Sequence, residues 1–207
     1  MHLDESAILW SAPERQRAGR PLIVLLHGYA SHEGDLFSLS PRLPLGATVA
    51  SLRAPLRESG GNAWWSLAGR GLEQLELATI DDPAQAVLDW LDTVEYTTVA
   101  LLGFSQGGAI ALHLNRLAPD RFAATVALAG FVAPGIHAGD AQLKQIRPPV
   151  FWGRGTADTV IPAAAVDLTA EWLPTHTEAT IRIYEDLGHS ISTQELSDLT
   201  GFLGEHL

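Results

Sequence analysis

The residue best placed to do chemistry is Ser105, which lies between two glycines in Gly103-Phe104-Ser105-Gln106-Gly107. A serine hydroxyl is a weak nucleophile unless a neighbouring base removes its proton. In a Gly-x-Ser-x-Gly motif the serine occupies a strained turn between a buried strand and a helix. The chains on either side approach so closely that a side chain at Gly103 or Gly107 would clash. The motif therefore predicts a nucleophilic serine.

The residues on either side of this motif fit such a turn. An apolar run at 99–102 precedes it, as expected of a buried strand, and Ala109-Ile110-Ala111-Leu112 after it is typical of a helix. The backbone N–H of Gln106 would then lie at the helix N-terminus, where it stabilises a developing negative charge. The alternative is an ordinary glycine-rich turn, and the flanking segments favour the nucleophilic serine over it.

A base and an acid for this serine are predicted at the same edge of the sheet. Ser105, Asp158 and His189 each occupy a turn directly after a predicted strand, and the carboxyl ends of parallel strands share one edge. Histidine is the usual base for a serine, and a carboxylate usually orients it. The order Ser, Asp, His along the chain is that of α/β-hydrolases and differs from the other two common orders.

Other candidates for the acid and the base are weaker. Asp186 lies too close to His189 along the chain to reach around its ring, and Asp140, in the loop after the preceding strand, is a less favoured source of the acid. Asp158 has the alternative role of a turn or cap residue, a common one for aspartate. The remaining candidate bases, interpreted as structural or solvated, are His113 and His137.

The loop after the first strong strand is a candidate for a second oxyanion donor. It contains His27-Gly28-Tyr29-Ala30, and it lies beside the serine turn if the two strands are neighbours. We expect the backbone N–H of Tyr29 to donate to the oxyanion. His27 is interpreted as a side chain that fixes the loop by hydrogen bonding, because a metal site with His32 lacks a third ligand.

Two adjacent aromatic residues, Trp64 and Trp65, lie in a glycine-rich stretch at 56–72 that is predicted to be irregular. Loops at the carboxyl ends of strands carry function more often than core packing. We therefore expect these rings to line an apolar substrate pocket, with Val160 on the opposite wall beyond the Asp158 turn. The alternative for either ring is to anchor the loop.

Strands alternate with helices along the chain, which predicts a mostly parallel sheet with helices on both faces. Long apolar runs are typical of strands that are buried on both faces. The predicted strands are 8–10, 21–26, 47–52, 99–104, 122–128, 148–153 and 180–184. The predicted helices are 34–43, 106–119, 162–173, 194–207 and one that starts at Asp81 or Asp82, with Pro83 in its first turn, and ends near Thr93. Residues 132–147 are predicted to be irregular, and without repeats or a linker we expect one domain, 1–207.

Composition excludes several classes of function. The net charge of −11 is spread along the chain without runs, which argues against a nucleic-acid partner or an anionic membrane surface. The absence of cysteine excludes disulfides, thiolate metal sites and a cysteine nucleophile. The N-terminal residues lack the apolar core of a signal peptide and no run reaches the length of a membrane span, so we predict a cytoplasmic protein. The sequence leaves the oligomeric state open, a homodimer included.

Four segments are the most specific feature of the chain. They are Leu-Leu-His-Gly-Tyr-Ala-Ser-His-Glu-Gly-Asp-Leu at 25–36, Gly-Phe-Ser-Gln-Gly-Gly at 103–108, Gly-Thr-Ala-Asp-Thr-Val-Ile-Pro at 155–162 and Gly-His-Ser-Ile-Ser at 188–192. Together they resemble the phospholipase/carboxylesterase family of α/β-hydrolases, which includes bacterial carboxylesterases and acyl-protein thioesterases. They occur in the family's order and span most of the chain from Pro21 onward.

The resemblance implies an α/β-hydrolase fold with little or no cap domain, and no cofactor. The catalytic triad and oxyanion amides that it implies are Ser105, Asp158, His189, Tyr29 and Gln106. The chain departs from the family at two positions. Ala30 replaces a usual glycine in the His-Gly-x-Gly turn, which concerns the shape of that loop, and Ser190 replaces a usual glutamate after the histidine, which concerns the surroundings of the base.

We therefore expect a serine carboxylesterase that hydrolyses small to medium acyl esters through an acyl-enzyme on Ser105. An acyl-thioesterase or a lysophospholipase would use the same groups with a different pocket shape. In an acyltransferase or perhydrolase, a nucleophile other than water would intercept the acyl-enzyme. The alternative from a different class is a non-catalytic ligand-binding protein with a hydrolase fold, since fold alone does not fix function.

Overall fold

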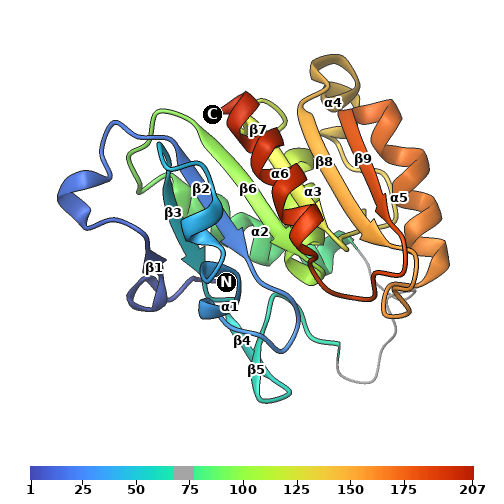
Figure 1. Cartoon of the computed structure of the whole chain (residues 1–207), viewed down its shortest axis with the longest axis horizontal. Helices are drawn as coiled ribbons and strands as arrows, with labels where there is room; N and C mark the ends of the chain where they lie inside the picture. Colours follow the sequence, from blue (N-terminus) through green and yellow to red (C-terminus); the bar gives the residue numbers. More distant parts are fainter. Residues whose placement is uncertain (68–76) are drawn as a thin grey trace.

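The fold is built on a central sheet, as seen in a computed structural model that describes residues 1–67 and 77–207 (Figure 1). The strands of this sheet are β1 (Leu9–Trp10), β2 (Leu22–Leu26), β3 (Thr48–Leu52), β6 (Val99–Phe104), β7 (Ala124–Leu128), β8 (Pro149–Gly155) and β9 (Glu178–Tyr184). Their order in space is β1-β3-β2-β6-β7-β8-β9. The β1–β3 pair is antiparallel and the remaining neighbours are parallel, so the predicted mostly parallel sheet is confirmed.

Helices cover both faces of this sheet (Figure 1). On one face lie α2 (Leu77–Leu91), α3 (Gln106–Leu117) and α5 (Ala163–His176), and α4 (Asp140–Ile146) packs against α3 and α5. On the other face lie α1 (Gly34–Phe37) and α6 (Thr193–His206). Short 3₁₀ helices are η1 (Glu5–Ala7), η2 (Glu14–Gln16) and η3 (Ser40–Arg42). The fold is therefore an α/β sandwich of three layers, and no cap domain is evident among the described residues.

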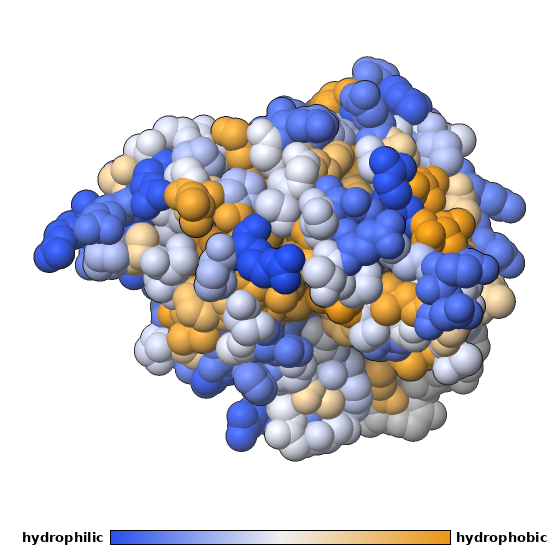
Figure 2. Space-filling model, in the orientation of Figure 1, coloured by the Kyte–Doolittle hydropathy of each residue, from blue (hydrophilic) through white to orange (hydrophobic). Residues whose placement is uncertain are grey.

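The strand β2 shows why apolar runs mark the centre of this sheet. Its side chains alternate between two hydrophobic cores: Leu22, Val24 and Leu26 pack toward α2 and α3, and Ile23 and Leu25 pack toward α1 and α6. All of these side chains are buried. On the face formed by α1 and α6, polar and apolar surface side chains are interspersed (Figure 2).

The segment predicted to be irregular at 56–72 contains a hairpin of β4 (Leu56–Glu58) and β5 (Gly61–Ala63). Its turn residues Ser59 and Gly60 have φ values of 51° and 82°, the left-handed conformation that a two-residue hairpin turn requires. The prediction was wrong because the short strands carry mixed polar and small residues without an apolar alternation. Residues 68–72 of the predicted stretch lie outside the described residues.

The helix predicted to start at Asp81 or Asp82 starts earlier in the structure. The helix α2 already includes Leu77, and Pro83 lies in its interior instead of its first turn. A proline there removes one helix hydrogen bond. Burial of an apolar stripe that continues through the proline outweighs this loss. The buried residues of the stripe are Ile80, Ala84, Val87, Leu88 and Leu91.

Two further predictions are corrected, one of an irregular stretch and one of a helix end. The stretch predicted to be irregular at 132–147 contains the helix α4. Leu143 is the one buried leucine of this helix, and a single buried apolar residue gives no helical periodicity in the sequence. This helix ends at Arg147 in a left-handed conformation, with φ 51°. The helix predicted at 162–173 continues to His176, with Pro174 inside its last turn.

Among the described residues, no helix combines the length and the apolar character that crossing a membrane requires.

Candidate active site

Ser105 lies at the sharp turn between β6 and α3. Its φ of 54° and ψ of −117° are a strained conformation for a residue that has a side chain. A Cβ at Gly103 would lie 2.1 Å from the carbonyl oxygen of Gly107, and a Cβ at Gly107 would lie 1.9 Å from that of Leu26. The predicted steric need for both glycines is confirmed, and the turn holds the serine in one fixed orientation.

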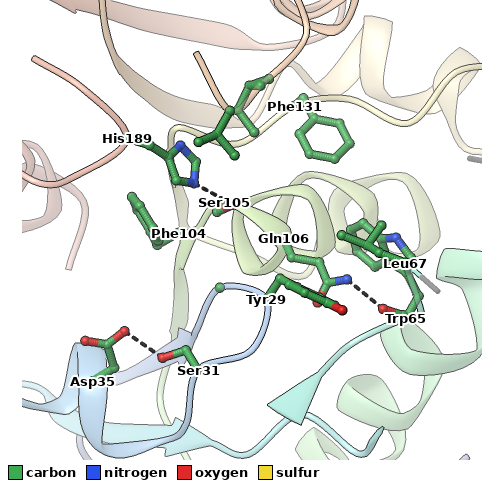
Figure 3. Close-up of a pocket in the computed structure, with 13 residues that line it drawn as sticks. Tyr29, Ser31, Asp35, Trp65, Leu67, Phe104, Ser105, Gln106, Phe131 and His189 are labelled. Carbon is green, nitrogen blue, oxygen red and sulfur yellow. Dashed lines mark hydrogen bonds between the residues drawn. The ribbon is translucent and has the colours of Figure 1, made fainter. Parts of the chain in front are cut away.

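The side chains of Ser105, His189 and Asp158 form one hydrogen-bonded chain, and Figure 3 shows its link from His189 to Ser105. The Nε2 atom of His189 lies 2.9 Å from Ser105 Oγ, and its Nδ1 atom lies 2.8 Å from Asp158 Oδ2. Because a carboxylate only accepts, Nδ1 carries the proton and donates it. In a neutral ring, Nε2 then accepts a hydrogen bond from the serine hydroxyl.

The carboxylate of Asp158 is fixed by its own turn as well as by the imidazole. The side chain is 5% exposed, and its Oδ1 atom accepts hydrogen bonds from the backbone N–H groups of Val160 at 2.9 Å and Ile161 at 3.3 Å. Burial raises the pKa of Asp158, but the hydrogen bonds from His189 and Val160 outweigh it and hold the pKa below its ordinary value. Asp158 is therefore an ionised partner for the ring.

The alternative acids have other partners or positions. The carboxylate of Asp140 accepts two hydrogen bonds from the buried guanidinium of Arg116, each of 2.7 Å. Burial raises the pKa of Asp140, but these bonds outweigh it and hold the pKa below its ordinary value. Asp186 is exposed in the turn after β9. Neither of them contacts His189 in the described structure.

The other histidines lie outside this arrangement. His113 is buried, and its Nε2 atom lies 2.6 Å from Asp81 Oδ1. Burial lowers the pKa of His113. Its ring packs edge-on against His137 with centroids 5.5 Å apart. The described residues contain no group of three or more His, Asp or Glu that is placed to hold a metal ion.

The two predicted oxyanion donors both border the same cavity as Ser105. Gln106 is the first residue of α3, where a backbone N–H has no partner within the helix. The loop that carries Tyr29 is held by the buried ring of His27, whose Nε2 accepts the backbone N–H of Ala54 at 3.1 Å and whose Nδ1 donates to the carbonyl of Gly28 at 2.7 Å. Burial lowers the pKa of His27, which favours this neutral form.

The two departures from the family's motifs leave this geometry in place. Ala30 adopts φ 56°, the left-handed conformation that glycine reaches without strain. The loop therefore keeps a conformation suited to glycine at the cost of local strain. Ser190 is exposed beside His189.

A cavity of about 270 Å³ opens at Ser105 (Figure 3). Trp65 and Val160, two of the three predicted wall residues, line it. The third, Trp64, does not. Its ring is fully buried, and its indole N–H donates to the carbonyl of His27 at 2.9 Å. Trp64 therefore has the alternative role, that of anchoring its loop.

The side chain of Gln106 connects this wall to the serine turn. Its Oε1 atom accepts the backbone N–H of Trp64 at 2.8 Å, and its Nε2 atom donates to the carbonyl of Trp65 at 2.8 Å (Figure 3). Gln106, a residue of the cavity lining, thus holds the loop of the two tryptophans with its side chain.

Several residues that line the cavity were missed from the sequence. Those missed are Ser31, Asp35, Leu67, Phe104, Phe131 and Ile161. Phe131 follows β7 at the same sheet edge as the serine, and Ser31 follows β2, so the argument from strand ends applied to both. The direction of these side chains depends on loop packing, which residue spacing does not encode.

Comparison with known proteins agrees with the motifs. The sequence profile described as Phospholipase/Carboxylesterase matches residues 12–207. Acyl-protein thioesterase 1 of Saccharomyces cerevisiae is 31% identical over 109 residues, which are 51% of this chain and 48% of that protein. The chain spans about half the length of the curated relatives that it first matches.

Solved structures share the fold over nearly the whole chain. Esterase PE8 superposes with a TM-score of 0.78 at 25% identity, covering 100% of both chains. The carboxylesterase of Bacillus cereus superposes with a TM-score of 0.80 at 18% identity, covering 97% of this chain and 94% of its own. The α/β-hydrolase fold implied by the sequence motifs is therefore confirmed.

Proposed function

Because this chain belongs to the phospholipase/carboxylesterase family, we propose that it is a serine carboxylesterase acting on small to medium acyl esters. The observation that carries the proposal is the position of His189, hydrogen-bonded to Ser105 on one side and to Asp158 on the other. In this arrangement the base, the nucleophile and the group that orients the base are within hydrogen-bond reach before substrate binds.

In the proposed reaction, His189 Nε2 takes the proton of Ser105 as Oγ attacks the ester carbonyl carbon. The negative charge that forms on the carbonyl oxygen is stabilised by the backbone N–H groups of Tyr29 and Gln106. His189 then gives its proton to the leaving alcohol oxygen, and the carbon–oxygen bond of the ester breaks. The products of this half of the reaction are the alcohol and an acyl-enzyme on Ser105.

The second half of the reaction uses the same groups with water. His189 removes a proton from a water molecule that attacks the acyl carbon, and the proton returns to Ser105 Oγ as the acid leaves. Asp158 keeps the ring oriented and stabilises its positive charge in both halves. Its lowered pKa supports this role, because the carboxylate stays ionised while the imidazole gains and loses a proton.

The apolar side of the cavity supports an acyl group of limited length. Trp65, Leu67, Phe131 and Ile161 line it, and apolar side chains favour a hydrocarbon chain over water. A volume of about 270 Å³ suits a short to medium chain. The substrate panel that tests this is a series of p-nitrophenyl esters of increasing acyl length, measured as kcat/KM on wild type and Ser105→Ala.

A thioesterase is the second candidate, because the yeast relative is named acyl-protein thioesterase 1. The proposed groups act on thioesters in the same way, so an acyl thioester and a lysophospholipid belong in the same panel. Hydrolysis of oxygen esters that requires Ser105 supports the carboxylesterase. A strong preference for the thioester would indicate a thioesterase instead of a carboxylesterase, and a strong preference for the lysophospholipid would indicate a lysophospholipase. Folded protein that binds esters without turnover would indicate a ligand-binding protein.

The cytoplasmic location and a single domain spanning 1–207 remain part of this proposal. Cell fractionation tests the first. Sedimentation of the purified chain decides whether it is a monomer or a homodimer.

A further inference from the structure

The cavity at Ser105 has two chemically different ends. In Figure 3, Trp65, Leu67 and Phe131 lie on one side of the serine, and Ser31 and Asp35 lie on the other. The first end is apolar, and the second carries a hydroxyl and a carboxylate. An ester has two parts on either side of its carbonyl carbon, so each end of the cavity takes one part.

The position of the base decides which part lies where. The leaving oxygen receives its proton from His189 Nε2, so the alcohol part of the ester departs on the side of the ring. His189 packs against Phe104 with centroids 4.9 Å apart, and in Figure 3 both rings lie on the same side of the cavity as Asp35. The acyl chain then occupies the apolar end.

The end of the cavity that takes the alcohol part, lined by Ser31 and Asp35, has a negative electrostatic potential. Asp35 is exposed, and its Oδ2 atom accepts a hydrogen bond from Ser31 Oγ at 2.7 Å. Of the described residues that line the cavity, Asp35 alone is a carboxylate, and none is a lysine or an arginine. Arg53, the residue after β3, is not among these lining residues, and its guanidinium is held in an ion pair with Glu33. No described side chain of the lining therefore neutralises Asp35.

We propose that Ser31 and Asp35 form the leaving-group subsite, and that Asp35 selects esters of neutral or cationic alcohols over esters whose alcohol part carries a phosphate or a carboxylate. This inference rests on the proposed esterase function. A cationic alcohol would place its charge beside the Asp35 carboxylate, whereas an anionic one would be repelled by it. Because Asp35 is exposed to solvent, the effect is moderate and weakens as salt is added.

The test compares two butyrate esters that differ by one charge. Butyrylcholine and 3,3-dimethylbutyl butyrate have alcohol parts of the same shape, and only the first carries a positive charge. The ammonium group also makes choline the better leaving alcohol, so the baseline is the ratio of the two esters' rates with hydroxide. We expect wild type to favour butyrylcholine in kcat/KM by about fivefold beyond this hydroxide ratio at low ionic strength. A third ester, O-butyrylglycolate, has an anionic alcohol part and should be hydrolysed more slowly than the neutral ester.

Two variants localise the effect. Asp35→Asn keeps an oxygen that accepts the bond from Ser31 but removes the charge, so the preference for butyrylcholine should fall about fivefold, to the hydroxide ratio. Asp167→Asn removes one charge from an exposed residue of α5 and should leave the preference as in wild type. The rate of Asp167→Asn on the neutral ester should be as in wild type, because Asp167 is not among the residues that line the cavity.

The outcomes separate this inference from the function on which it rests. A wild-type preference at or below the hydroxide ratio with intact Ser105-dependent hydrolysis overturns the subsite and leaves the esterase standing, whether or not Asp35→Asn folds. An equal loss of preference in Asp35→Asn and Asp167→Asn also overturns it, because net charge would then explain the effect. Absence of any Ser105-dependent ester hydrolysis overturns both.

Discussion

At the scale of single residues, the site depends on the ring of His189, whose Nε2 lies 2.9 Å from Ser105 Oγ and whose Nδ1 lies 2.8 Å from Asp158 Oδ2. Each of these three residues follows a strand, and for this reason the sequence predicted them at one edge of the sheet. The walls of the cavity could be predicted only in part. Phe131 and Asp35 lie at the same edge, but their side-chain directions depend on packing between loops.

Replacing the acid tests how the base is oriented. Asp158→Asn should leave the fold intact and lower kcat by about 10⁴-fold, as the same change does in a serine protease, because the amide favours the wrong tautomer of the imidazole. The measurement is kcat with a p-nitrophenyl ester, beside the melting temperature. In Asp140→Asn, which disturbs the pair with Arg116, we expect a lower melting temperature and a nearly normal kcat. The reverse pattern would assign the acid to Asp140.

Glu195 leads to a prediction about stability and pH. This glutamate in the first turn of α6 is 1% exposed, and neither carboxylate oxygen has a hydrogen-bond partner among the described residues. Burial raises its pKa to about 7, and the nearby backbone N–H of Ser192 offsets this only in part. The folded protein therefore holds a proton that the unfolded chain releases between the ordinary glutamate pKa and about pH 7.

The sign of the effect follows from this proton. Stability should fall as the pH rises through that interval, by about 2 to 3 kcal/mol in total. Glu195→Gln, which carries no charge at any pH, should melt at a higher temperature than wild type at pH 8 and at a similar temperature at pH 5. The matched control is Glu205→Gln, an exposed residue of the same helix. A gain for Glu195→Gln that is equal at both pH values would show that charge burial is not the cause.

At the scale of elements, strands of continuous apolar sequence were predicted well, and short elements were not. The continuous apolar sequence of β2 is buried on both faces, so this sequence pattern correctly predicted a strand in the interior of the sheet. The hairpin of β4 and β5 and the short α4 have few buried apolar residues, and they are stabilised by tertiary contacts that the local sequence does not show. The turn residues Ser59 and Gly60 were the signal that could have identified the hairpin.

The exit of β5 carries two adjacent tryptophans with different surroundings. Trp65 lines the cavity, and Trp64 is fully buried with its indole N–H bonded to His27. Trp65→Ala should shift the preferred acyl chain to greater length, because a wall is removed and each added CH₂ that fits raises kcat/KM by up to about fourfold. Trp64→Ala should instead lower stability by about 3 to 5 kcal/mol and leave the length preference unchanged.

Acyl-length profiles and melting temperatures of both variants check this pair. Unchanged profiles in both would show that the exit of β5 does not border the acyl chain. A length shift in Trp64→Ala at normal stability would exchange the two roles.

At the scale of the whole molecule, the parallel sheet brings residues far apart in sequence to one edge. Ser105 and His189 meet although β7, β8 and β9 lie between them along the chain. Because strands of the sheet contribute side chains to all three hydrophobic clusters of the described residues, we expect one cooperative unfolding transition, with tryptophan fluorescence and far-ultraviolet circular dichroism giving coincident curves in urea. Two separate transitions would contradict the prediction of a single domain.

The proposed mechanism requires Ser105 to be an activated nucleophile, and a fluorophosphonate probe detects such a serine. Such a probe forms a stable phosphonate ester with a serine only where a base activates the hydroxyl. We expect one adduct per chain, found by mass spectrometry on the peptide that contains Ser105, and no adduct in Ser105→Ala. Folded wild-type protein that stays unlabelled, or labelling that persists in Ser105→Ala, would contradict this mechanism.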